Sequence, residues 1–251
     1  MIRSEITGGI RVLTLARPEA LNAFNTDQFE RLAELIVEAA DDPGTRVVVL
    51  TGEGRAFSAG ADLSGTPPAR ADYKYGFPGM VEVIIDFPKP FIVAANGLGV
   101  GVGATILGLA DMAFMAESAR LRCPFSALGL TAEACSTYTF SRLMGPQKAA
   151  RFLLGAEWWD AAACKEAGLA LDVFPDAEFM DRVMAFARDL AAWPMPSLIE
   201  TKGLLMAPHR EAMHRANREE NEALARLRGG AANVEAMKAF REKREPNFAN
   251  L

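Results

Sequence analysis

Glu133 has neighbours along the chain that suggest acid–base chemistry. It lies in the segment LGLTAEACSTY, and no lysine or arginine occurs within five positions on either side. Apolar surroundings desolvate a carboxyl group, and this raises its pKa towards the range of a general base at neutral pH. An ordinary solvated glutamate in the first turn of a helix, stabilised by the helix dipole, fits the same local sequence. Both interpretations are open at this point.

Two glycine-rich segments could bring backbone N–H groups close to a ligand. Residues 52–65, GEGRAFSAGADLSG, contain four glycines and three alanines, so a ligand could approach the backbone closely. A flexible loop without a function is the alternative for this segment. Residues 91–111, FIVAANGLGVGVGATILGLAD, predict a buried strand, a glycine-rich turn and a helix that starts near Val102. The free N–H groups at the start of such a helix favour a ligand that is, or becomes, an anion.

Residues 91–111 are also long enough to span a membrane, because twenty uncharged residues precede Asp111. Glycines at four-residue spacing, such as Gly97 and Gly101, occur in pairs of membrane helices. However, the glycines of this segment, together with Asn96, would break a helix at mid-membrane. We therefore expect a buried strand, turn and helix here, and no membrane association.

The length, composition, net charge and cysteine count restrict the class of protein. The chain has 251 residues, and 50% of them are hydrophobic, which is enough for a sizeable core. Its net charge of −5 argues against a nucleic-acid partner, since such proteins usually carry a basic surface. The first ten residues lack the pattern of a signal peptide, and the odd set of Cys123, Cys135 and Cys164 is typical of reduced thiols in the cytoplasm. His209 and His214 would face different sides of a helix, so no metal site is expected.

Strand and helix patterns alternate along the first part of the chain, which predicts an α/β architecture. Gly8-Gly9 between two β-rich runs predicts a hairpin, and Asn25 or Thr26 is expected to cap the helix that follows. Expected strands cover residues 2–7, 10–15, 46–52 and 91–95, with a further pair within 112–125, and expected helices include 26–40, 146–154 and 160–168.

After residue 176 the chain is predicted to be helical, with a break at residues 193–196. This divides it into an α/β core (1–192) and a C-terminal helical region (193–251). Residues 209–228 carry charges of alternating sign, which are typical of a solvated helix face. The polar segment 65–79 is interpreted as a mobile cover over a site.

Several segments in a fixed order carry a resemblance to a known family. They are FSAGADL after a hydrophobic strand, AANGLGVGVGATILGLAD, AGLALDVFP and a helical tail. In this order they resemble the enoyl-CoA hydratase/isomerase (crotonase) superfamily, from LARPEALNAF to AFREKREPNF. The segment CPFSALGLTAEACSTYTFSRLMG is most similar to the peroxisomal-type Δ3-Δ2-enoyl-CoA isomerases, without their additional acyl-CoA-binding domain. The resemblance implies a core of ββα units wound as a spiral and a C-terminal helical region that forms trimers or hexamers.

The resemblance also implies an oxyanion hole of two backbone N–H groups for the thioester carbonyl of an acyl-CoA substrate. By position these are the N–H groups of Ala59 and Val102, and each such donor is worth about 3–4 kcal/mol in the transition state. Glu133 would be the catalytic base, and neither a metal nor a separate cofactor is implied. Implied contacts to CoA or the acyl chain are Ala23, Phe24, Ser58, Gly60, Ala61, Asp62, Leu63 and Phe125, with Arg17 as a further contact and with Phe240 and Lys243 reaching a neighbouring subunit's CoA.

Two departures from the family pattern favour an isomerase. Hydratases of this family use two glutamates, and the corresponding positions here hold Thr105 and Phe125. One carboxylate is sufficient to move a double bond, because it can take the C2 proton and return it at C4. We therefore expect a cytoplasmic 3-enoyl-CoA isomerase that serves fatty-acid β-oxidation. The alternatives are a hydratase or thioesterase on the same fold, or a non-catalytic acyl-CoA-binding protein.

Overall fold

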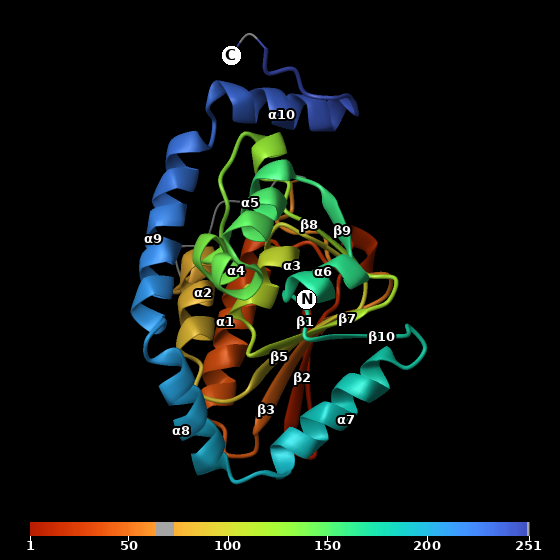
Figure 1. Ribbon diagram of the computed structural model, residues 1–251, viewed down its shortest axis with the longest axis vertical. Coiled ribbons are helices and arrows are strands. Elements are labelled where there is room, and N and C mark those ends of the chain that lie inside the picture. Colours follow the sequence, from red (N-terminus) through yellow and green to blue (C-terminus); the bar gives the residue numbers. More distant parts are fainter. Residues whose placement is uncertain (64–72, 250) are drawn as a thin grey trace.

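The computed structural model describes residues 1–63, 73–249 and 251 (Figure 1). Within these residues the strands form two sheets, with orders β1-β2-β3-β5-β7-β10 and β4-β6-β8-β9. The strands are β1 (Ile2–Thr7), β2 (Ile10–Leu15), β3 (Val47–Gly52), β4 (Ala56–Ser58), β5 (Phe91–Ala95), β6 (Leu98–Val100), β7 (Met112–Ala116), β8 (Arg120–Arg122), β9 (Trp158–Asp160) and β10 (Asp172–Phe174).

Helices follow these strands and surround both sheets (Figure 1). The α-helices are α1 (Thr26–Asp41), α2 (Gly76–Asp86), α3 (Val102–Thr105), α4 (Ser136–Met144), α5 (Pro146–Gly155), α6 (Ala161–Ala167), α7 (Phe179–Ala192), α8 (Met195–Met206), α9 (Arg210–Leu227) and α10 (Ala231–Glu242). Three 3-10 helices, η1 (Pro18–Ala20), η2 (Ile106–Leu109) and η3 (Ser126–Leu128), join them.

Consecutive strands are shared between the two sheets. In the pairs β3-β4, β5-β6 and β7-β8, the first strand joins the larger sheet and the second joins the smaller one, before the chain turns into a helix. The strands from β2 to β10 in the larger sheet are parallel, while β1 and β2 form the expected antiparallel hairpin. This is the spiral of ββα units that the resemblance implies, and the expected fold class is confirmed.

The middle strands of the larger sheet form the centre of the core. Every residue of β5 is buried, and so are the first five residues of β3. Parallel strands covered on both faces require such continuous apolar runs, which is why both strands could be found in the sequence. Helix α7 packs on strands β2, β3, β5 and β7. Helix α1 begins after Asn25, whose side chain accepts a hydrogen bond from the Gln28 N–H in a capping box.

The two strands expected within residues 112–125 are present as β7 and β8, but they do not pair with each other. β7 pairs with β5 and β10 in the larger sheet, whereas β8 pairs with β6 and β9 in the smaller one. The intervening residues 117–119 carry the chain from one sheet to the other. Sequence propensity locates both strands but contains no information on which partners they meet.

Only part of the segment 65–79, which was expected to form a mobile cover, can be compared with the structure. Residues 65–72 lie outside the described residues, and from Gly76 onward the chain is already in α2, so the last part of the segment is helical. The segment 91–111 is divided among β5, β6, α3 and η2. Across the described parts of the chain, no helix combines the length and apolar character needed to cross a membrane.

The helices after residue 193 pack against the preceding part of the chain. The buried Lys202 ammonium of α8 lies 2.7 Å from an Asp111 carboxylate oxygen and donates to the Lys89 carbonyl oxygen. On α10, the Asn233 side chain donates to the Leu128 carbonyl oxygen. In Figure 1, α9 runs along one side of the molecule and α10 crosses its end.

Candidate active site

The two glycine-rich segments lie against each other where β4 and β6 run in parallel. A Cβ atom on Gly60, which has a φ of 88°, would lie only 2.6 Å from the Val100 carbonyl oxygen. A Cβ atom on Gly103 would lie 2.3 Å from the Ser58 carbonyl oxygen. Such distances are too short for any side chain, so the contact depends on glycine at both positions. The structure thus brings the FSAGAD segment to the start of α3.

Val102 is the first residue of α3, as expected. Gly101 precedes it with a φ of 54°, and the N–H of a first helical residue has no acceptor inside its own helix. The Val102 N–H lies near enough to the Glu133 carboxyl group to lower its pKa. A backbone donor and the candidate base are therefore adjacent.

The assignment of the other backbone donor to Ala59 is contradicted. The Ala59 N–H donates a hydrogen bond to the Leu21 carbonyl oxygen at 2.9 Å, so it is already used inside the protein. In a parallel bridge, Phe24 donates to the Gly60 carbonyl oxygen at 2.7 Å and accepts from the Asp62 N–H at 2.8 Å.

The same bridge leaves the N–H of Ala61, rather than that of Ala59, as a candidate donor to a ligand. Because Gly60 and Asp62 direct their polar groups towards Phe24, the N–H of Ala61 between them points to the opposite side of the extended chain. Ala61 is exposed, and its N–H has no acceptor among the residues that the structure describes. Ala61 was expected only as a contact residue, since the sequence gives no sign of the bridge to Phe24.

The Glu133 carboxyl group is held in desolvated surroundings. Its Oε1 atom would lie 3.5 Å from a Cβ atom on Gly101, and the side chain keeps only partial contact with solvent. Burial raises the pKa of Glu133 from 4.5 to about 7, and the negative charge of Glu220 acts in the same direction. The Arg228 charge and the Val102 N–H oppose this increase. A carboxyl with this pKa can accept and return a proton near neutral pH.

The interpretation of Glu133 as a solvated residue in a first helical turn is wrong. Helix α4 begins only at Ser136, and Glu133 precedes a turn in which Ala134 and Cys135 have φ values of 57° and 59°. Glu220 is likewise not part of a solvated face, although it lies in the charge-rich helix α9. It is 5% exposed and accepts hydrogen bonds from the backbone N–H groups of Cys135 and Thr137.

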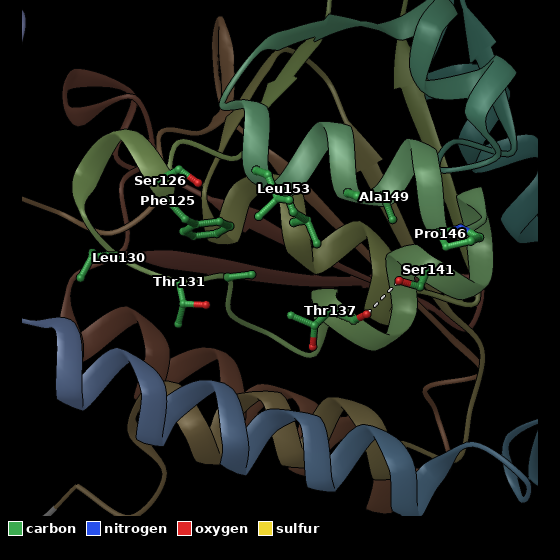
Figure 2. Close-up of a pocket in the computed structure, with 12 residues that line it drawn as sticks. Phe125, Ser126, Leu130, Thr131, Thr137, Ser141, Pro146, Ala149 and Leu153 are labelled. Carbon is green, nitrogen blue, oxygen red and sulfur yellow. Dashed lines mark hydrogen bonds between the residues drawn. The ribbon is translucent and has the colours of Figure 1, made fainter. Parts of the chain in front are cut away.

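The two positions at which hydratases carry glutamates hold side chains without acid–base function. Thr105 is fully buried on α3, and its hydroxyl oxygen has no hydrogen-bond partner among the described residues. Phe125 is 5% exposed and contributes its ring to a cavity of about 250 Å³. Figure 2 shows Phe125, Ala149 and Leu153 across this cavity from Thr131 and Thr137. The cavity provides apolar surface beside the turn that carries Glu133.

Several side chains that were expected to contact CoA have partners inside the protein. The Ser58 hydroxyl donates to the Asn22 carbonyl oxygen, and the buried Phe24 ring stacks on Phe29 with centroids 5.0 Å apart. Arg17 bonds to the Ala23 carbonyl oxygen and lies 3.1 Å from an Asp62 carboxylate oxygen. These side chains therefore shape the FSAGAD segment. The N–H groups of Ala59, Gly60 and Asp62 are bonded inside the protein, which leaves the N–H of Ala61.

The remaining predicted residues lie in two different places. Leu63 is 40% exposed, at the edge of the described FSAGAD segment. Phe240 is 60% exposed on α10, and Lys243 is the exposed residue that follows this helix with a φ of 54°. Their expected contact with a neighbouring subunit stays a prediction. Within the described part of the chain, no group of three His, Cys, Asp or Glu residues is arranged to hold a metal ion.

Comparison with known proteins shows the family of the chain. The family model described as enoyl-CoA hydratase/isomerase matches residues 5–250. The chain belongs to the enoyl-CoA hydratase/isomerase family. Two structures of this family illustrate the fold. An enoyl-CoA hydratase/isomerase from Pseudoalteromonas atlantica T6c matches with a TM-score of 0.94 at 30% identity, over 99% of both chains. An enoyl-CoA hydratase from Mycobacterium marinum matches with a TM-score of 0.78 at 44% identity, over 82% of this chain and 99% of that one.

Curated relatives in the family carry different reactions in their names. Enoyl-CoA delta isomerase 2 of Homo sapiens is 35% identical over 84% of this chain, but the match covers only 56% of that relative. The chain thus spans about half the length of that isomerase. The 1,2-epoxyphenylacetyl-CoA isomerase of Escherichia coli (strain K12) is 31% identical, over 98% of this chain and 97% of the relative. Family membership supports an enzyme of the crotonase superfamily, and the reaction has to be argued from the site.

Proposed function

We propose that the protein is a Δ3-Δ2-enoyl-CoA isomerase that moves the double bond of a 3-enoyl-CoA to the trans-2 position. The observation that carries the proposal is a desolvated carboxyl, Glu133, placed beside the first N–H of α3. The hydratase carboxylate positions hold Thr105 and Phe125, so this base has no second acid at either place. The similarity to enoyl-CoA delta isomerase 2 of Homo sapiens supports the same reaction class.

In the proposed reaction, the N–H groups of Ala61 and Val102 bind the thioester oxygen. The Glu133 carboxylate removes a C2 proton, and the electrons of that C–H bond form an enolate intermediate. In the second step the enolate electrons form the C2–C3 double bond, while the electrons of the C3–C4 double bond take the proton back from Glu133 at C4. The intermediate carries its negative charge on the thioester oxygen, where backbone donors stabilise it without reorganisation. One carboxylate therefore returns to its starting state in each turnover, and no water, metal or redox partner enters the balance.

The pKa of Glu133 makes the proposal testable by pH. The free enzyme needs the ionised carboxylate, and Glu133 has a pKa of about 7. We therefore expect kcat/KM to rise with pH and to level off above the pKa of this group. Binding of the thioester oxygen at Val102 would also withdraw an N–H that now stabilises the Glu133 anion, which makes the carboxylate a stronger base in the complex.

The decisive experiment is Glu133→Gln with 3-enoyl-CoA as substrate. Isomerisation should fall by roughly a hundredfold or more, the scale of one lost general base. Glu219→Gln is a matched control, because this residue is exposed on α9 and undergoes the same loss of charge. Full isomerase activity in Glu133→Gln would remove this residue from the mechanism.

Two further assays separate the alternative functions. Addition of water to a 2-enoyl-CoA, or hydrolysis of the thioester, at a rate above that of isomerisation would support a hydratase or thioesterase. Tight CoA-ester binding without exchange of the C2 proton in deuterated water would identify a non-catalytic binding protein. The proposal expects proton exchange at C2 and C4 with little water addition.

A further inference from the structure

The turn that carries Glu133 is held by a residue far away in the sequence. Glu220 of α9 accepts from the Cys135 N–H at 2.7 Å through Oε2, and from the Thr137 N–H at 2.9 Å and the Thr137 hydroxyl at 2.6 Å through Oε1. Cys135 and Thr137 flank the first residue of α4, so this carboxylate satisfies N–H groups that the helix cannot satisfy itself. The contact thus caps α4 from outside its own segment.

The backbone between Glu133 and α4 needs such support. Ala134 and Cys135 are both in the left-handed region, with φ values of 57° and 59°. Residues with a Cβ atom adopt this conformation at an energetic cost, and they keep it only where the surrounding structure holds them. Glu220 binds directly at the second of these residues.

Glu220 is arranged as an anion. The two backbone N–H groups can only donate, one to each carboxylate oxygen, so both oxygens must accept. Its burial raises the pKa of Glu220, whereas the hydrogen bonds from Thr137 and Cys135 favour the charged form. The residue thus places a buried negative charge next to the turn of Glu133.

We propose that Glu220 is the positioning residue for Glu133: its carboxylate fixes the strained turn that aims the base, and its charge faces the base from α9. The proposal rests on the proposed function of Glu133. A second consequence concerns proton affinity, because the Glu220 charge is the largest influence after burial that raises the pKa of Glu133. Without it the base would lose its proton at lower pH.

Other groups near Glu133 and Glu220 also contribute to the electrostatics of this site. Arg228, which follows α9, lowers the pKa of Glu133, and so does the Val102 N–H of α3. Cys123, after β8, is a buried thiol whose own pKa is raised by burial and by Glu133. Glu82 of α2 adds to the negative potential at Cys135. Replacing Glu220 therefore leaves Arg228 as the opposing charge, and the pKa of Glu133 should fall.

The test replaces Glu220 and follows Glu133 directly. In protein carrying ¹³C at the glutamate carboxyl carbon, the Glu133 signal is assigned by its loss in Glu133→Gln and titrated by NMR. Glu220→Gln should lower the pKa of Glu133 by roughly half a unit or more. It should also lower kcat for 3-enoyl-CoA isomerisation by roughly tenfold or more, with KM changed less than twofold, because a misplaced base weakens chemistry rather than binding. Glu219→Gln on the exposed face of α9 is the control and should change neither quantity.

A second variant separates charge from position. Glu220→Asp keeps the anion but withdraws it by one methylene group, so it should leave the pKa of Glu133 nearer to the wild-type value while still lowering kcat. This variant also serves if Glu220→Gln does not fold. An unchanged pKa of Glu133 in folded Glu220→Gln, or wild-type kcat in Glu220→Asp, would overturn the proposal.

The NMR titration also keeps this proposal apart from the proposed function. If the wild-type protein does not isomerise 3-enoyl-CoA but Glu220→Gln still lowers the pKa of Glu133, the proposed function is wrong and the coupling of the two carboxylates stands. If isomerisation depends on Glu133 and is indifferent to Glu220, the proposed function stands and the positioning role is wrong.

Discussion

Glu133 is expected to reduce the stability of the folded protein whenever it is ionised, and Glu133→Gln should remove this effect. Its pKa is about 7 in the folded state against 4.5 for an unperturbed glutamate. Between these values the folded state holds a proton that the unfolded state has released. The contribution of this group to the free energy of unfolding is therefore fully present below about pH 4.5 and is lost as the pH rises through 7.

The size of the effect follows from the same shift. One pKa unit corresponds to about 1.4 kcal/mol, so the full shift from 4.5 to about 7 amounts to at most about 3.5 kcal/mol, and partial solvent contact of Glu133 reduces this. Glutamine has a similar shape and does not titrate. The free energy of unfolding of Glu133→Gln minus that of wild type should therefore increase by about 2–3 kcal/mol between pH 5 and pH 8, because wild type loses stability over this interval and Glu133→Gln does not.

Urea unfolding of both proteins at the two pH values measures this difference, since two-state analysis gives the free energies directly. The exposed control Glu219→Gln should change by less than about 0.5 kcal/mol over the same interval. A stability difference between Glu133→Gln and wild type that does not depend on pH would refute the reasoning. It would mean that Glu133 titrates as a solvated residue, and the pH argument for a base would fail with it.

Three other substitutions test separate parts of the structure. Val102→Pro removes one N–H at the first position of α3, where proline is tolerated, and should lower kcat for isomerisation by roughly a hundredfold while circular dichroism shows an intact fold. Thr105→Val replaces a buried hydroxyl without a partner among the described residues, and urea unfolding should show a protein that is equally stable or more stable by about 1 kcal/mol. Lys202→Met leaves the Asp111 carboxylate and the Lys89 carbonyl oxygen without their cation, and should lower the free energy of unfolding by about 3 kcal/mol in the same assay.

The sequence alone determined the features that depend on short stretches of chain. The continuous apolar runs of β3 and β5 located the central strands, and Gly8-Gly9 located the hairpin, because both signals are local. The same holds for the start of a helix near Val102. The local sequence singled out Glu133 but left open whether its carboxyl is solvated, and the structure decided this. The order of these segments was also enough to indicate the family, which the comparison over residues 5–250 bears out.

Only the tertiary structure decided what depends on contacts between distant residues. Ala59 and Ala61 have the same side chain, and it is the bridge to Phe24 and the bond to Leu21 that determine which N–H stays free. Glu220 lies 85 positions from Cys135 in a charge-rich helix, and local sequence cannot tell a buried carboxylate from a solvated one. Hydrogen-bond direction and burial are properties of the packed chain, so the free N–H of Ala61 and the contacts of Glu220 could be found only in the folded structure.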